Sequence, residues 1–158
     1  MRWIWTATFT IAATLGLSGA LRAQTASQSI WDGVYTAAQA DRGKVVYSDA
    51  CSRCHAETLD GADEVPPVKG SHFMTNWDGQ TIADLVQRIR NTMPLDDPGS
   101  LSGASTTDLV AYLLQQNGAP AGGTELPNDT GVQTGVHITA TAPAGAAPTP
   151  AAPSSPAG

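Results

Sequence analysis

Apolar residues recur at helical spacing in three stretches of the chain, and each stretch begins with a residue that can cap a helix. The first follows Thr36, which forms a capping-box pattern with Gln39 three residues later. Its small and apolar positions are Ala40, Gly43, Tyr47 and Ala50. We therefore predict a helix over about residues 37–49 that delivers the chain to Cys51.

A second helix is predicted to begin at Thr81, which has Asp84 three residues later. Its apolar stripe consists of Ile82, Leu85, Val86 and Ile89. Pro94 forces an end, because proline has no N–H to donate and its ring clashes with the preceding turn.

A third helix is predicted to begin at Ser105, with Asp108 three residues later, and to stop at Gly118. Its apolar face is formed by Leu109, Tyr112 and Leu113. No stretch alternates convincingly as a strand, so the predicted fold class is all-α.

Residues 56–80 are rich in glycine and proline and show no periodicity. A structureless loop of this length is uncommon in a small domain unless it wraps something. The three helices also carry few large apolar side chains. A domain so short of core usually needs a disulfide, a metal or a cofactor as an internal filler.

The first 23 residues are typical of a signal peptide for export. Arg2 supplies the positive start, and residues 3–17 are uncharged and mostly apolar. We favour cleavage after Ala23, which places the mature protein in a periplasm or beyond. The alternative is an uncleaved membrane anchor, because the uncharged stretch is close to a bilayer span in length. Its threonines and glycines make it a poor anchor.

The composition changes again after Gly118. Residues 139–158 contain eight alanines, five prolines and no charge. Such a segment cannot bury enough surface to offset its ordering entropy, so we predict a disordered Ala/Pro/Thr-rich tail over residues 119–158. The tail is explained equally well as a tether or spacer and as a disordered end without a function. His137 is expected to be solvated.

Composition and charge narrow the function classes. The 158 residues suit one small domain with tails and exclude a large multidomain enzyme. Eight Lys and Arg oppose fourteen Asp and Glu, a net charge of −6, which argues against nucleic-acid binding. Cleavage of the signal would remove Arg2 and Arg22, which leaves six basic residues and a mature charge of about −8.

The strongest chemical motif is Cys51-Ser52-Arg53-Cys54-His55, which contains both cysteines of the chain. Cys-x-x-Cys followed by His is the attachment signature of c-type haem. Two thiols three residues apart can each add to a vinyl group of the porphyrin, and the adjoining imidazole can bind the iron. A redox disulfide is disfavoured, because it would be expected to follow a strand and a helix is predicted before Cys51. A structural zinc site is also disfavoured, because it needs four ligands at paired spacings and the motif offers one cysteine pair with an adjoining histidine.

The sixth iron ligand decides between electron transfer and ligand chemistry. The candidates are Met74, Met93, His72 and His137, and we favour Met93 because it follows an amphipathic helix and precedes the rigid Pro94. Ligation by His55 and Met93 would raise the reduction potential and leave no open position on the iron. One-electron transfer is the expected consequence.

The second nitrogen of His55 needs an acceptor that fixes the orientation of its ring. Pro66 and Pro67 offer carbonyl groups at a plausible distance along the loop. We favour Pro66 in this role. The alternative is that the two prolines only constrain a turn.

From about Asp32 to Gly123 the sequence resembles the class I c-type cytochromes, the small monohaem kind. The resemblance lies in the haem motif, the 66–70 loop, Met93-Pro94, and a pairing of Gly43 and Tyr47 with Leu109 and Tyr112. It implies a cytochrome c fold in which three main helices and long loops surround one covalently bound haem c. Together with the composition of the two ends, it predicts a signal peptide over 1–23, an N-terminal extension over 24–35, a haem domain over 36–118 and the tail over 119–158.

A narrower resemblance is to bacterial cytochrome domains associated with quinoprotein dehydrogenases. It is carried by residues 31–36, Phe73, Trp77, Pro98-Gly99 and the Ala111-Tyr112-Leu113-Leu114 run. It implies a dehydrogenase as electron donor. For a carrier of this kind we expect an oxidase or another cytochrome as acceptor. The function we expect is an exported one-electron carrier that is not an enzyme. The alternatives are a haem subunit of a larger respiratory complex and a haem ligand-binding sensor.

Overall fold

The computed structural model describes residues 27–144, and the fold they form is all-α with one small strand pair. The predicted signal peptide and the last part of the predicted tail lie outside these residues. In chain order the elements are β1 (Gln28–Ser29), η1 (Ile30–Asp32), α1 (Ala37–Ala50), α2 (Ser52–His55), α3 (Gly70–Trp77), α4 (Ile82–Thr92), α5 (Gly103–Gln116), α6 (Thr130–Thr134) and β2 (Val136–His137). None of the described helices is long and apolar enough to cross a membrane.

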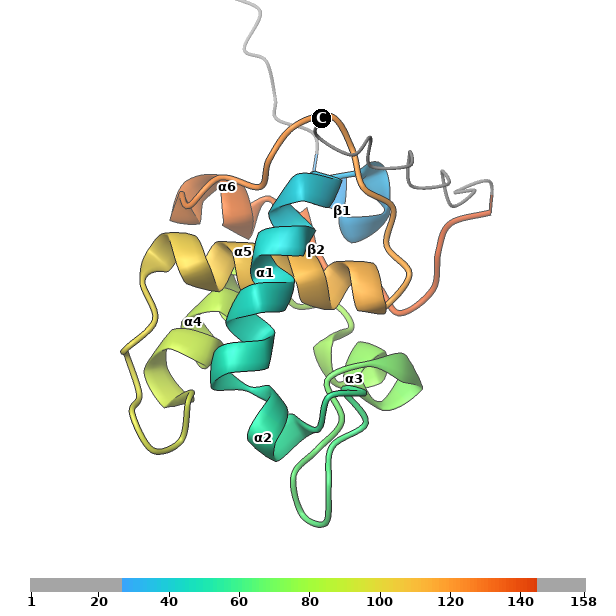
Figure 1. Ribbon diagram of the computed structural model, residues 1–158. Coiled ribbons are helices and arrows are strands. Elements are labelled where there is room, and N and C mark those ends of the chain that lie inside the picture. The colour runs from blue at the N-terminus through green and yellow to red at the C-terminus, as the bar shows by residue number, and fades with distance from the viewer. Residues whose placement is uncertain (1–26, 145–158) are drawn as a thin grey trace, which may run out of the picture.

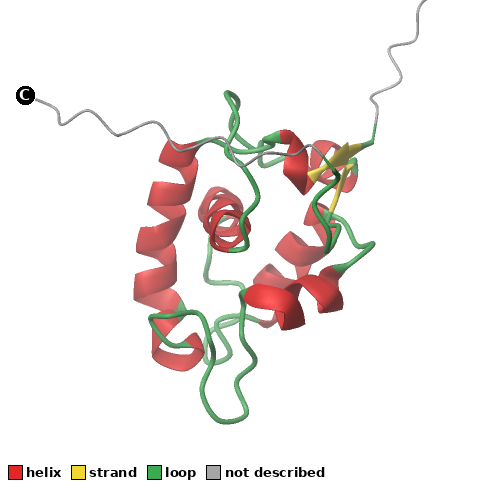
Figure 2. Ribbon diagram, turned by 90° about the vertical axis from the view of Figure 1, so that its right-hand side faces the viewer, coloured by secondary structure: helices red, strands yellow, loops and turns green. Residues whose placement is uncertain are grey.

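The centre of the fold is the crossing of α1 over α5 (Figures 1 and 2). The predicted pairing is present, since the rings of Tyr47 and Tyr112 lie 5.5 Å apart between centroids. Gly43 is buried at this crossing, and a Cβ there would lie 1.9 Å from the carbonyl oxygen of Asp108. Only glycine allows so close an approach of the two backbones.

The remaining predicted helices are also present, with one boundary moved. Thr81 and Asp84 form a reciprocal capping box at the start of α4, as predicted. The third helix begins earlier than predicted, because Ser102 caps it by accepting a hydrogen bond from the backbone N–H of Ser105.

The predicted loop over residues 56–80 is shorter in the structure, because α3 occupies its second half. This helix has only two turns, too few for a periodic pattern to stand out. It buries Phe73 and Met74 in the core, and Trp77 packs on Phe73 with 6.2 Å between ring centroids. Met74 therefore packs as core.

The prediction of a disordered tail from residue 119 onward is wrong for residues 119–144. This part of the chain contains α6 and β2 and buries the apolar side chains of Leu126, Val136 and Ile138. β2 pairs in parallel with β1, so the two ends of the described chain meet. His137 is half-buried in β2. The large apolar residues in this segment are too widely spaced to show a pattern.

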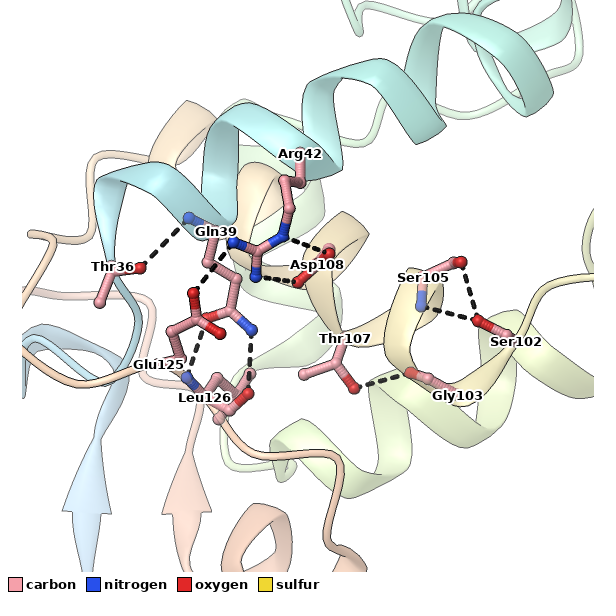
Figure 3. Close-up of polar contacts among 10 residues, drawn as sticks. All are labelled: Thr36, Gln39, Arg42, Ser102, Gly103, Ser105, Thr107, Asp108, Glu125 and Leu126. Atoms are coloured by element: carbon pink, nitrogen blue, oxygen red, sulfur yellow. Dashed lines mark hydrogen bonds and ion pairs between the residues drawn. The ribbon is translucent and has the colours of Figure 1, made fainter. Parts of the chain in front are cut away.

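Gln39 holds residues 119–144, called the C-terminal segment below, against α1. The capping-box prediction is half right, because Thr36 caps α1 but the Gln39 side chain turns away from the helix start (Figure 3). Its amide donates to the carbonyl oxygen of Leu126 at 2.9 Å and accepts from the N–H of Leu126 at 2.8 Å. Gln39 is 2% exposed, so it satisfies two backbone groups in the interior.

Arg42 adds a surface link beside Gln39 (Figure 3). Its guanidinium forms a two-pronged ion pair with Asp108 on α5 and a further ion pair with Glu125. One side chain of α1 thus joins both the crossing helix and the C-terminal segment.

Tyr35 provides a test of how strongly this segment is buried. The side chain is inaccessible to solvent, and its hydroxyl donates to the carbonyl oxygen of Ala119 at 2.6 Å. Burial raises the pKa of Tyr35 from 10.0 to about 12. Below pH 10 the phenol is neutral in the folded and unfolded chains alike, so its stabilising contribution is fully present. Between pH 10 and 12 the unfolded chain loses the proton more readily.

We therefore expect the free energy of unfolding to fall as the pH rises from about 10 to 12, and to fall less steeply in Tyr35→Phe. Denaturant unfolding at a series of pH values measures both slopes. Parallel slopes for the two proteins would contradict the burial of the phenol. Tyr47 also has a pKa raised by burial, so the variant should retain part of the slope.

Candidate haem-binding site

The Cys-x-x-Cys-His motif lies at the foot of α1, where α1 ends and α2 begins (Figure 1). Cys51 is half-buried and caps α1, while Cys54 is exposed on α2. The two thiols are not joined in a disulfide. Burial, and secondly the charge of Cys54, raises the pKa of the Cys51 thiol to about 11. Both sulfurs are available for thioether bonds.

Tyr47 fixes this turn to α1. Its hydroxyl donates to the carbonyl oxygen of Ala56 at 2.6 Å and lies 3.2 Å from that of His55. Burial is the main cause that raises the pKa of Tyr47 above its ordinary range, so the phenol remains a donor. The helix that crosses α5 therefore also positions the end of the motif.

The ring of His55 is oriented by the carbonyl group that the sequence suggested. Its Nδ1 lies 2.9 Å from the carbonyl oxygen of Pro66. A carbonyl oxygen can only accept, so Nδ1 carries the proton and Nε2 keeps a lone pair for a metal.

Asn117 supports the segment that carries Pro66, a role that no sequence motif indicates. Its Oδ1 accepts from the N–H of Gly70 at 2.9 Å, and its Nδ2 donates to the carbonyl oxygens of Val68 and Leu113. The N–H of Val68 also donates to the carbonyl oxygen of Leu59. An asparagine at a helix end is a common feature, so only the fold reveals these distant partners.

Met93 lies directly after α4, where its N–H donates to the carbonyl oxygen of Ile89 at 2.8 Å. The side chain is half-buried and packs against the core. The other candidates for the sixth ligand differ in setting: Met74 is buried in α3, His72 is exposed on α3 and bonded to Asn76, and His137 belongs to β2.

A side-chain contact joins the haem motif to the segment that follows Met93. The guanidinium of Arg53, inside the motif, forms an ion pair with the carboxylate of Asp96. The structure therefore brings the segments carrying His55 and Met93 into direct contact.

The donor set fits a covalently bound haem. It offers two unpaired thiols on one helical turn, an imidazole with Nε2 available, and a half-buried thioether on a neighbouring segment. Within residues 27–144 no group of three or more His, Cys, Asp or Glu could hold a metal ion by itself. Cys51 and Cys54 would hold the porphyrin, and His55 would hold its iron.

The part of the chain from α1 to α5 has the all-α fold and the single Cys-x-x-Cys-His turn of the monohaem c-type cytochromes, a class that acts in haem-based electron transfer and carries haem c with its iron. Residues 38–113 match the family described as cytochrome C oxidase, cbb3-type, subunit III. This range runs from the start of α1 almost to the end of α5.

Among solved structures, the sulfane dehydrogenase SoxCD from Paracoccus pantotrophus matches the chain. The identity is 21%, the match covers 78% of this chain and 68% of that chain, and the TM-score is 0.45. No curated protein matches the chain.

Proposed function

We propose that this protein is an exported one-electron carrier in which His55 and Met93 are the two axial ligands of the haem iron. The observation that carries the proposal is the hydrogen bond from His55 Nδ1 to the carbonyl oxygen of Pro66, which leaves the lone pair of Nε2 free to bind a metal. The bound haem would supply the exchange of a single electron, with iron passing between Fe(II) and Fe(III).

The role of Met93 follows from its placement and chemistry. A neutral thioether favours the reduced metal and fills the sixth position. With both axial positions taken by side chains, no substrate would bind at the iron, so the protein would carry electrons without acting as an enzyme.

Charge and export support a redox protein as partner. A mature charge of about −8, once the signal peptide is removed, favours encounter with a basic partner face. We propose a periplasmic location, a dehydrogenase such as a quinoprotein as donor, and an oxidase or another cytochrome as acceptor.

Carbon monoxide tests the ligand assignment. The native ferrous protein should show a six-coordinate low-spin spectrum that does not change on addition of CO. Met93→Ala should open the sixth position and bind CO at stoichiometric concentration, because it removes the thioether that closes this position in the native protein. Optical spectra of the two proteins measure this difference.

Met74→Ala is the matched control, since it removes the same kind of side chain from the core and should leave the iron closed to CO. CO binding by Met74→Ala alone would transfer the ligand role to Met74. Avid CO binding by the native protein would instead favour a haem ligand-binding sensor.

A second candidate function is a haem subunit of a larger respiratory complex. It is favoured by the family match over residues 38–113, whose description names a subunit of an oxidase. Purification from native membranes and from the soluble fraction separates the two functions. Recovery in a stable complex with membrane subunits supports the subunit, whereas recovery as a single soluble chain supports the carrier.

A further inference from the structure

The segment from Met93 to Leu101, called the Met93 loop below, is held to the rest of the protein at few points. Its first N–H donates back to Ile89 in α4, and two further backbone hydrogen bonds, from Asp97 to Pro94 and from Ser100 to Asp97, stay within the loop. Leu101 packs against the core at its far end. These contacts shape the loop but leave its middle unattached.

The middle of the loop makes one polar contact with a distant part of the chain. Within residues 27–144, the ion pair between Asp96 and Arg53 is the single hydrogen bond or ion pair that joins this loop to anything beyond α4. The partners are 43 residues apart in sequence. Arg53 belongs to α2, between the two cysteines, so this contact connects the segments that carry the two proposed axial ligands, His55 and Met93.

We propose that Arg53 and Asp96 form a latch that keeps the Met93 loop closed over the sixth coordination position of the iron. The inference rests on the proposed role of Met93. An external ligand can take the sixth position only while Met93 is detached, and detachment requires the loop to move. A contact present only in the attached state shifts the population toward that state. Arg53 and Asp96 are therefore positioning residues that act through Met93.

The effect of the latch should be modest and dependent on salt. The two side chains are 63% and 61% exposed, so water and ions screen their attraction. Breaking the pair should raise imidazole binding to the ferric protein by about two- to fivefold, the range expected for an exposed ion pair. Higher ionic strength should bring the native protein closer to the variants.

The test compares imidazole binding to ferric holoprotein carrying Arg53→Gln, Asp96→Asn, or both. Each single change should increase binding and weaken the methionine–iron charge-transfer absorption, and the double change should add little, because either change breaks the same pair. Asp97→Asn is the matched control, since it removes the same charge from the adjacent position and no ion pair of Asp97 is found in the described chain. The swapped pair Arg53→Glu with Asp96→Arg should restore native binding.

Two results would overturn the latch. Equal effects of Asp96→Asn and Asp97→Asn would assign the change to net charge, and additive effects of the two single variants would show that the side chains act separately. Met93→Ala separates these failures from a failure of the proposed function. Imidazole binding that is equally strong in Met93→Ala and the native protein would overturn both the ligand assignment and the latch.

Discussion

Gly43→Ala should destabilise the protein by about 3 kcal/mol, although alanine is the better helix former by about 1 kcal/mol. The new Cβ would lie 1.9 Å from the carbonyl oxygen of Asp108 and 2.9 Å from the Cβ of Tyr112. The first of these atoms belongs to the backbone of α5 and cannot rotate away. The two helices would have to separate along their contact, which would also loosen the packing of Tyr47 on Tyr112.

Denaturant unfolding of the holoprotein measures this loss. Gly123→Ala is the control, because a Cβ at that position meets no heavy atom within 4 Å and its backbone is not left-handed. It should leave the free energy of unfolding within about 0.5 kcal/mol of the native value. A stabilising effect of Gly43→Ala would mean that helix propensity outweighs the crossing, and that the two helices lie farther apart than described.

Gln39→Ala should destabilise the protein by about 2 to 6 kcal/mol for a different reason. Its amide satisfies both the N–H and the carbonyl oxygen of Leu126 in a buried setting. Removing it leaves two buried backbone groups without partners, each at a cost of about 1–3 kcal/mol. The loss should also release the C-terminal segment, so proteolysis between residues 119 and 138 should become faster than unfolding of the whole protein.

Two further variants define the cause. Gln39→Glu keeps the size of the side chain but removes the N–H donor and introduces a charge, so it should destabilise at neutral pH. Gln87→Ala removes an exposed glutamine from α4 and should change stability by less than about 0.5 kcal/mol. If Gln39→Ala and Gln87→Ala behave alike, the C-terminal segment is not anchored through this amide.

The sequence reveals those parts of the fold that depend on local signals. The three long helices are predicted from the periodicity of their apolar residues and from caps such as Thr36 and Thr81. The close crossing at Gly43 could also be predicted, because the resemblance to class I c-type cytochromes paired Gly43 with the helix that carries Leu109 and Tyr112. The short helix α3 was missed because two turns with two buried residues do not stand out from an irregular loop.

The C-terminal segment was mispredicted for a physical reason. Its order depends on partners that lie far away in sequence, since Gln39 binds Leu126 and Tyr35 binds Ala119. Composition reports the average hydrophobicity of a segment, but it does not report a buried amide elsewhere that is directed at its backbone.

The contrast between local signals and distant contacts also separates the predicted parts of the site from the missed ones. The haem motif and the role proposed for Pro66 followed from chemistry within a short stretch, and the structure places that carbonyl oxygen 2.9 Å from His55 Nδ1. Asn117 and the pair of Arg53 with Asp96 were missed because nothing local marks them. Each contact joins a loop to a helix that is distant in sequence, so it can be seen only once the helices are packed.

The parallel pairing of β1 with β2 has a practical consequence for attaching the protein to other surfaces. Gln28 lies opposite Val136, and this pair is at the end of the molecule remote from α2 (Figure 1). If a linker, an electrode or a fused protein is joined next to either strand, the Cys51–His55 motif would therefore face away from the attachment. Immobilisation through the strand pair should preserve electron exchange with a dissolved partner, and a short peptide joining the two strands offers a route to a circularly permuted cytochrome.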